Sequence, residues 1–401
     1  MIGAGVFAAL GPAAEAAGSG LLIGLGVAAA IAYCNAASSA ELAARYPESG
    51  GTYVYGRARL GRLWGFLAGW AFVSGKVASC AAMALTFGAY VAPDLMRPLA
   101  IGAVVILTAV NLAGIEKTAR LSRVTVAIVL GALAVVTAAG ISAAPSAVGL
   151  GPLVPADGGV HGILQSAGIL FFAFAGYARI ATLGEEVKDP QRVIPRAIPL
   201  ALGVTLAVYA GIAIVALLSV GPAALARSIA PLATVANAGG AGWTVPVVRF
   251  GAAVASLGVL LSLLAGVSRT GFAMAAERDL PAWLDAVHPA RKVPHRAEVT
   301  VGGLVVAVLL FADIRAAIAF SSFLVLVYYT IANASAWTLV GEERRWPRVV
   351  PAAGLVGCVT VALSLPRGSV AGGIGLLGVG VAVWLLKRRR RVDVERNSPR
   401  Q

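Results

Sequence analysis

Apolar stretches of about 20 residues recur along almost the whole chain, and short polar segments separate them. A run of that length can cross the hydrocarbon core of a bilayer as one helix. The pattern therefore predicts an all-α integral membrane protein with about twelve transmembrane segments. The predicted segments are 1–14, 20–44, 63–91, 97–114, 122–143, 162–187, 195–219, 244–274, 297–312, 316–340, 347–366 and 369–386.

Composition supports the membrane assignment. Hydrophobic residues make up 59% of the 401 residues and charged residues only 12%, whereas soluble domains carry roughly 25% charged residues. The chain holds three cysteines and three histidines. The cysteines lie in predicted spans and the histidines in loops, without the spacing of metal ligands. We expect neither a metal nor a cofactor, and no enzymatic activity.

Positive charge is distributed unevenly between the two sets of loops. Of the 32 Lys and Arg residues, 24 fall in alternate loops that share one side of the membrane, namely 45–62, 115–123, 184–196, 278–296, 341–348 and 387–401. By the positive-inside rule that side is cytoplasmic, which predicts a cytoplasmic C-terminus in the inner membrane of the cell. The basic run from Lys387 to Arg391 can contact anionic lipid. The net charge of +14 thus reflects topology, and we expect no nucleic-acid partner.

Two of the apolar segments are interrupted by small residues at matching places, about half a molecule apart. The interruptions are Gly3-Ala4-Gly5 and Phe174-Ala175-Gly176. A break inside a membrane helix exposes backbone groups, which lipid cannot satisfy, so such breaks line substrate or ion sites in transporters. The alternative is close helix packing through glycine. Because no nucleotide-binding motif or domain is present, the breaks favour a secondary transporter over an ATP-driven pump.

Several motifs around these breaks resemble the amino acid/polyamine/organocation permease superfamily. They are Ile2 to Phe7 (IGAGVF), 41–53 (the Glu-Leu-Ala and Arg-Tyr-Pro-Glu-Ser-Gly-Gly-Thr-Tyr segment), 171–177 (FFAFAGY), 184–190 (GEEVKDP) and 268–281 (with Ser-Arg, Ala-Met and Asp-Leu-Pro). The resemblance implies one transmembrane permease domain over 1–401 with a LeuT-like fold. It would consist of two inverted five-helix repeats, 1–143 and 161–340, two extra helices in 347–386, and a basic cytoplasmic tail, 387–401.

The resemblance also implies where a substrate binds. In this superfamily the first break holds the substrate carboxylate through backbone amides, here those of Gly3, Ala4 and Gly5. The second break, which ends at Gly176, holds the ammonium through carbonyls, here those of Phe172, Ala173 and Ala175. Either Phe172 or Phe174 is a candidate aromatic gate, although each can equally be a packing residue. The amino end of a helix favours an anion and the carboxyl end favours a cation, which agrees with this assignment.

The chain departs from the superfamily pattern at its start, because Met1 directly precedes the first break. The cytoplasmic half of a first helix is therefore missing from the sequence as written. We interpret this as a misplaced start or a truncation rather than a genuinely shortened transporter.

The candidate residue for ion coupling also differs from the superfamily pattern. Some superfamily members place a coupling lysine in the fifth helix, where this chain has Val129. Lys76 instead lies fourteen residues after Arg62, about 21 Å along a helix and close to the midplane. We consider Lys76 a candidate proton-coupling residue, with a structural lysine as the alternative.

The charges near the second break bear on the substrate. Tyr177 is followed by Ala178 and Arg179, where many cationic amino acid permeases carry an acid. Without a central carboxylate, a neutral zwitterionic amino acid is favoured over a cationic one. Arg179 can instead pair with Glu185 or Glu186, and aromatic faces can also bind cations.

Two further sites each have two interpretations. Arg269 is either a residue at the membrane interface or part of a cytoplasmic gate with Glu185 or Glu186. Ser256 and Ser262 supply hydroxyls that suit a sodium ion, which is an alternative to proton coupling. The sequence thus predicts proton-coupled uptake of an amino acid, with exchange, or a non-transporting amino acid sensor, as the alternatives.

Overall fold

The computed structural model describes residues 2–46, 48, 50–114, 119–143, 152–154, 158–177 and 190–397. Helix accounts for 85% of the structure, and the described residues contain no strand. The helices are α1 (Gly5–Ala17), α2 (Leu21–Arg45), α3 (Thr52–Arg59), α4 (Arg62–Val91), α5 (Met96–Leu112), α6 (Ala119–Ala143), α7 (Gly159–Phe174), α9 (Pro190–Arg227), α10 (Pro231–Ala238), α11 (Thr244–Ala276), α12 (His295–Phe311), α13 (Ile314–Trp337), α14 (Val349–Ser364) and α15 (Arg367–Asn397). The all-α fold class predicted from the sequence is confirmed for the described residues.

Within the described residues, eight stretches of helix are long and apolar enough to cross a membrane, and α7 and α14 are shorter apolar helices. One of the eight runs from Gly5 to Arg45 and contains both α1 and α2. The predicted segment 162–187 corresponds to α7 at its start, but α7 ends at Phe174, and 178–189 lie outside the described residues. The short helices α3 and α10 were not predicted.

Helix α3 is set off from its neighbours by glycines at each end. Gly51, directly before it, has φ 57°, and Gly61, between α3 and α4, has φ 101°. These left-handed backbone conformations cost little only for a residue without Cβ. The chain therefore turns sharply twice, and α3 packs against α4 and α13.

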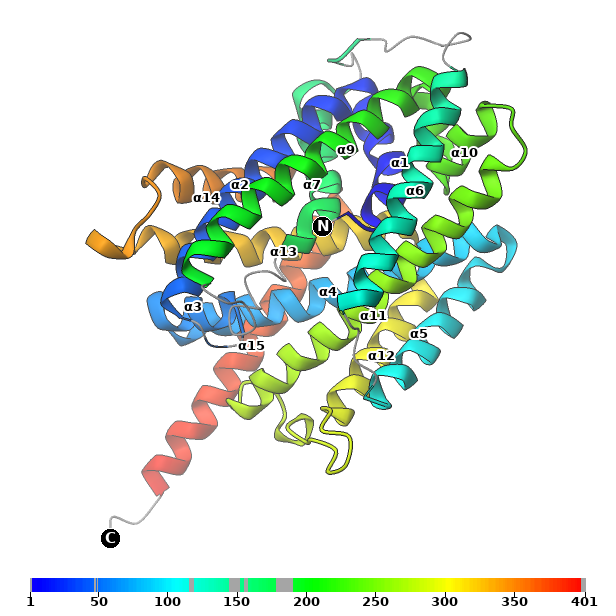
Figure 1. Ribbon diagram of the computed structural model, residues 1–401. Coiled ribbons are helices and arrows are strands. Elements are labelled where there is room, and N and C mark those ends of the chain that lie inside the picture. The colour runs from blue at the N-terminus through cyan, green and yellow to red at the C-terminus, as the bar shows by residue number, and fades with distance from the viewer. Residues whose placement is uncertain are drawn as a thin grey trace.

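Helix α4 occupies the centre of one half of the molecule, in contact with α11, α13, α5 and α12. The other half groups α1, α2, α7 and α9, and the amino-terminal end lies in the middle of the molecule beside α7 (Figure 1). Small residues allow these helices to approach closely, as membrane helix packing requires. A Cβ on Gly75 of α4, for example, would stand 2.9 Å from Cβ of Leu324 of α13.

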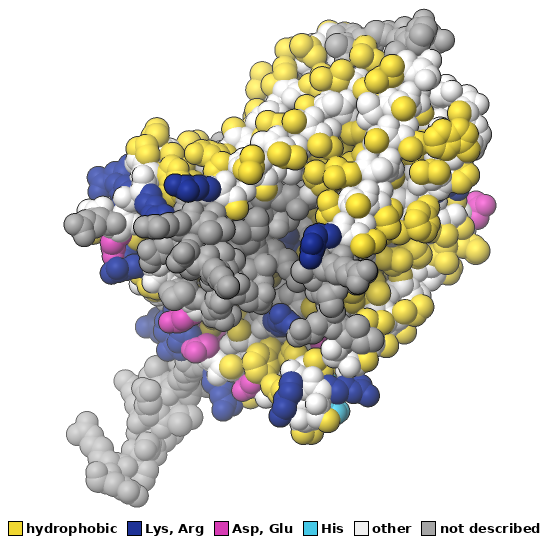
Figure 2. Space-filling view, viewed as in Figure 1, with side chains coloured by type: hydrophobic (Ala, Val, Ile, Leu, Met, Phe, Trp, Pro, Cys, Tyr) yellow, Lys and Arg dark blue, Asp and Glu magenta, His cyan; other side chains and the backbone are white. Residues whose placement is uncertain are grey.

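The surface separates into an apolar part and a basic end. Figure 2 shows hydrophobic side chains covering much of the visible face, while Lys and Arg gather toward one end of the molecule. The loops predicted to lie on the cytoplasmic side of the membrane contain Arg45, Arg57, Arg59 and Arg291. This distribution agrees with a multi-pass membrane protein.

Candidate functional site

The first sequence break is the amino-terminal start of α1. Residues 2–4 are not helical, and α1 begins at Gly5. Gly3 and Ala4 are buried, and the carbonyl of Ala4 accepts a hydrogen bond from the amide of Phe7 at 3.1 Å. The first amides of a helix have no intrahelical acceptor. The start of α1 therefore directs backbone donors into the interior.

The second break is the carboxyl end of α7. The helix ends at Phe174, and a single 3₁₀ turn, Ala175–Tyr177, follows. Ala173, Phe174 and Ala175 are buried, whereas Phe172 is half-buried and Gly176 is exposed. The last carbonyls of a helix lack intrahelical donors, so this end presents acceptors. Arg179, Glu185 and Glu186 lie outside the described residues.

The two breaks are in direct contact. A Cβ on Gly5 would stand 2.6 Å from the Cα of Ala173, closer than real Cβ atoms approach, so glycine allows α1 to start against the end of α7. The start of α1 carries a partial positive charge and the end of α7 a partial negative charge. The arrangement places the backbone donors at the start of α1 beside the backbone acceptors at the end of α7.

Tyr209 of α9 joins both breaks, and sequence reasoning did not identify it. Its hydroxyl donates to the carbonyl of Ala173 at 3.3 Å and is also hydrogen-bonded to the backbone of Gly3. Its ring packs against Phe174 with the centroids 5.4 Å apart. At 2% exposure the side chain is enclosed. One phenol therefore fixes the start of α1 relative to the end of α7.

Tyr90, near the end of α4, holds α1 from another side. Its hydroxyl donates to the carbonyl of Phe7 at 3.0 Å and accepts from the amide of Leu232, the second residue of α10, at 3.2 Å. The rings of Phe7 and Tyr90 meet edge to face at 5.7 Å. This contact connects α1 with α4 and α10.

Lys76 lies in the middle of α4 and is 6% exposed. On the helical wheel Lys76 falls between Ser79 and Gly69. Ser79 hydrogen-bonds Ser321 of α13 at 2.6 Å. Gly69 faces Met274 of α11. Lys76 therefore points between α13 and α11. Within the described part of the chain, the ion pairs of the structure do not include it.

A series of aromatic rings leads from Lys76 to α7. The ammonium lies 6.0 Å from the centroid of Phe72. Phe72 then contacts Tyr328, which contacts Tyr329, and Tyr329 meets Phe171 at a centroid distance of 5.9 Å. The lysine and the second break are therefore connected by packed rings.

The two candidate sodium ligands of α11 differ in the structure. Ser262 donates to the carbonyl of Gly258 in its own helix at 3.0 Å. Ser256 is fully buried and has no hydrogen-bond partner within the described residues. Val129, the position predicted to replace the coupling lysine of some superfamily members, is buried in α6. Only Ser256 of these residues presents a polar atom without a partner.

Arg269, the remaining gate candidate, is exposed on α11. It lies within electrostatic reach of Glu298, a buried carboxylate in the first turn of α12. The side-chain amide of Asn111 donates to Glu298 at 3.5 Å. The structure therefore gives Arg269 a carboxylate neighbour other than the predicted Glu185 and Glu186.

Helix α3 connects the ends of α11 and α13. Tyr53 donates to the carboxylate of Asp279, just beyond α11, at 2.7 Å. Burial, together with that carboxylate, raises the pKa of Tyr53 well above its usual range, so the phenol remains a donor. Arg57 pairs with Glu277 at 2.5 Å.

At the other end of α3, Arg59 donates to the hydroxyl of Thr338, the residue after α13, at 2.8 Å. It also pairs with Glu343 at 3.4 Å. We refer to Tyr53, Arg57 and Arg59 with these partners as the α3 clasp. The 41–53 motif includes Tyr53, but the sequence did not predict which residues contact α3.

A family model for amino acid permeases matches residues 1–384. The chain belongs to the amino acid permease family. The resemblance to the amino acid/polyamine/organocation superfamily is thereby confirmed. A match over nearly the whole chain includes both breaks, α4 and the α3 clasp.

Three relatives illustrate the range of this family. The permease is 62% identical over 391 residues to an uncharacterized transporter of Mycobacterium tuberculosis, covering 97% of this chain and 88% of the relative. It is 28% identical over 322 residues to the branched-chain amino acid permease BcaP of Bacillus subtilis, covering 74% and 68%. It is 28% identical over 366 residues to cationic amino acid transporter 4 of Homo sapiens, covering 84% and 56%. Family and relatives support amino acid transport and indicate a transporter rather than an enzyme.

Proposed function

We propose that this permease moves a neutral, zwitterionic amino acid across the cell membrane, coupled to protons. The observation that carries the proposal is the contact between the start of α1 and the end of α7. An α-amino acid carries its carboxylate and ammonium on one carbon, so its binding site needs donors and acceptors side by side. The amides of Gly3, Ala4 and Gly5 are the proposed carboxylate ligands.

The proposed ammonium ligands are the carbonyls at the end of α7, those of Phe172, Ala173 and Ala175. Phe172 and Phe174 remain the proposed aromatic gate. Phe174 is fully buried against Tyr209, whereas Phe172 is half-buried. This difference favours Phe172 as the ring with freedom to move and Phe174 as the packing residue.

Charge supports a neutral substrate. The buried carboxylates among the described residues are Glu41, Asp279 and Glu298. Glu41 accepts from the amides of Arg345 and Trp346, Asp279 belongs to the α3 clasp, and Glu298 lies in the first turn of α12. All three lie near helix ends, whereas Lys76 is placed toward the interior. A second positive charge on the substrate would be repelled by Lys76.

Lys76 is the proposed proton-coupling residue. A charged amine buried without a counter-ion is costly, so such a group readily exchanges its proton when its surroundings change. The aromatic series from Phe72 to Phe171 offers a packed connection to the substrate site. Rearrangement at the second break would then alter the surroundings of Lys76.

The proposed transport cycle is alternating access in a LeuT-like fold, with repeats over 1–143 and 161–340 and a cytoplasmic C-terminus. The distribution of Lys and Arg supports this orientation. In that orientation the α3 clasp lies on the cytoplasmic side. Opening to the cytoplasm then requires the ends of α11 and α13 to separate or to move together with α3.

Uptake of labelled amino acids by proteoliposomes containing the full chain tests the proposal. The panel should include leucine, alanine, arginine and glutamate, each with and without an inward proton gradient. Accumulation of a neutral amino acid that increases with the gradient is expected. Uptake that depends on an internal amino acid would identify an exchanger, preferred uptake of arginine would refute the neutral substrate, and binding without flux would indicate a sensor.

A further inference from the structure

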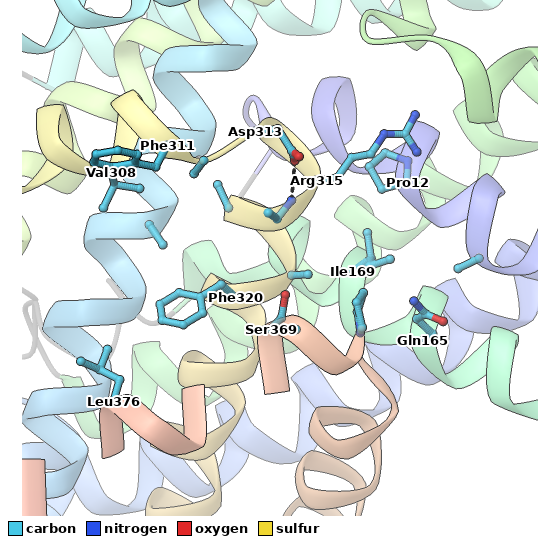
Figure 3. Close-up of a pocket in the computed structure, with 18 of the residues that line it drawn as sticks. Pro12, Gln165, Ile169, Val308, Phe311, Asp313, Arg315, Phe320, Ser369 and Leu376 are labelled. Carbon is cyan, nitrogen blue, oxygen red and sulfur yellow. Dashed lines mark hydrogen bonds between the residues drawn. The ribbon is translucent and has the colours of Figure 1, made fainter. Parts of the chain in front are cut away.

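A pocket of about 1270 Å³ lies apart from both breaks, outward along α1 and α7. Pro12 of α1 and Ile169 of α7 line one side of it, while α4, α12, α13 and α15 supply the rest (Figure 3). Its lining contains none of the residues of the two breaks. It is therefore a space distinct from the proposed substrate site.

Much of the pocket wall is apolar. Val308 and Phe311 of α12, Phe320 of α13 and Leu376 of α15 line this part (Figure 3). Phe311 is 88% exposed, so this wall is continuous with the outer surface of the helices. In a membrane-spanning protein such a surface faces hydrocarbon chains rather than water.

The remaining wall is polar and charged. Glu15, Asp313 and Arg315 line it together with Gln165 and Ser369. Asp313 and Arg315 flank the start of α13 at Ile314, the depth at which a spanning helix leaves the hydrocarbon region. The apolar wall thus ends at a charged rim where lipid headgroups lie.

The rim combines two carboxylates with one guanidinium, and the imidazole of His161 also lines the pocket. Arg315 forms an ion pair with Glu15 and donates to the carbonyl of Ala226 at the end of α9. Asp313 is exposed, and one carboxylate oxygen accepts from the amide of Ala316 at 2.8 Å. Both Asp313 and Glu15 line the pocket. The rim is therefore suited to a headgroup that carries both signs of charge.

We propose that this pocket binds a phospholipid with a primary amine, of the phosphatidylethanolamine class. The acyl chains lie along the wall of Val308, Phe311, Phe320 and Leu376. The ammonium is held by Asp313 and Glu15, and the phosphate by Arg315, as charge-assisted hydrogen bonds.

The headgroup choice follows from charge and hydrogen bonding. A phosphatidylglycerol headgroup brings only negative charge to a rim with two carboxylates. A phosphatidylcholine headgroup carries an ammonium without N–H groups, so it cannot donate to Asp313 or Glu15. A primary ammonium beside a phosphate satisfies both signs. This proposal does not depend on what the permease transports.

The test is lipid retention by the purified full chain, measured by native mass spectrometry after equilibration with equal amounts of phosphatidylethanolamine, phosphatidylcholine and phosphatidylglycerol. Two variants probe the site. Asp313→Asn removes one of the two negative charges of the rim but keeps an oxygen that can cap α13. Ala307→Phe fills the apolar wall from an exposed position on α12. Ala134→Phe is the matched control, because Ala134 is exposed on α6 and outside the pocket.

We expect the unmodified chain to retain phosphatidylethanolamine preferentially. Asp313→Asn should lower that retention by about tenfold, since a charge-assisted hydrogen bond is lost. Ala307→Phe should lower it similarly, whereas Ala134→Phe should leave it unchanged. Equal retention of the three lipids, preference for phosphatidylglycerol, or retention unaffected by both pocket variants would overturn the proposal.

Discussion

Gly5 begins α1 so close to Ala173 that a side chain at this position would require one helix to move. A Cβ there would lie 2.6 Å from the Cα of Ala173 and 2.9 Å from its Cβ. Because the first contact is with backbone, a small rotation of a side chain cannot relieve it. The contact makes the relative position of α1 and α7 sensitive to a single methyl group.

Gly5→Ala should therefore impair substrate binding. The added methyl forces α1 and α7 apart, and overpacking of this kind costs about 1–3 kcal/mol. The proposed donors for the substrate carboxylate and the proposed acceptors for its ammonium would then no longer lie side by side. We expect an increase of the KM for uptake of about tenfold or more.

The matched control is Gly26→Ala on α2, where an added Cβ meets no atom within 4 Å. It should transport like the unmodified permease and unfold at the same temperature. If Gly5→Ala also has an unchanged KM, the proposed role of the contact is wrong.

Tyr209→Phe separates hydrogen bonding from ring packing. The ring can still lie against Phe174, but the carbonyl of Ala173 and the backbone of Gly3 lose their shared partner. Leaving buried polar groups unsatisfied costs about 1–3 kcal/mol. We expect a lower unfolding temperature and weaker binding of the substrate.

Tyr33→Phe serves as the control, because Tyr33 is 39% exposed on α2. Thermal unfolding followed by tryptophan fluorescence, together with equilibrium binding, provides both readouts. Equal unfolding temperatures for the two variants would contradict a bridging function of Tyr209.

The sequence predicted those features that depend on local composition. Apolar runs long enough to span a bilayer indicated the helices, and glycine within such runs indicated where α1 begins and where α7 ends. Tyr209 was missed because it lies in the mainly apolar segment 195–219, where spacing does not distinguish it from its neighbours. Its partner Ala173 is 36 positions away, a separation that only the fold can bring together.

The α3 clasp shows the same limit. The motif around Tyr53 could be recognised, but Asp279 lies 226 positions further along the chain. The two serines of α11 also appeared equivalent in the sequence. In the structure, Ser262 bonds to its own helix, while Ser256 has no partner within the described residues. Hydroxyl direction depends on rotamer and neighbours, which periodicity does not encode.

Lys76→Met should uncouple transport from the proton gradient. The variant keeps an unbranched side chain of similar length but cannot carry a proton. Accumulation driven by an inward proton gradient should fall to the level seen without one, and the pH dependence of uptake should flatten. Counterflow of the same substrate between equal pH values should persist, since the breaks are unchanged.

Lys292→Met is the control for loss of one positive charge, because Lys292 is exposed in the loop before α12. Unaltered gradient-driven accumulation in Lys76→Met would rule out the coupling role. Loss of counterflow as well would assign the lysine to substrate binding or folding instead.

Tyr53→Phe tests the α3 clasp, since it removes the hydrogen bond to Asp279, whose side chain is largely buried. The loss should lower the free energy of unfolding by about 1–3 kcal/mol. Arg57→Gln, which breaks a partly exposed ion pair, should lower it by less than about 1 kcal/mol.

The raised pKa of Tyr53 also predicts how the stability of the permease changes with pH. Its stabilisation is complete below the pKa of an unfolded phenol, about 10, and is lost as the pH rises above it. Unfolding temperatures between pH 7 and 11 should therefore fall more steeply for the unmodified permease than for Tyr53→Phe, and parallel curves would show that the clasp does not contribute in this way.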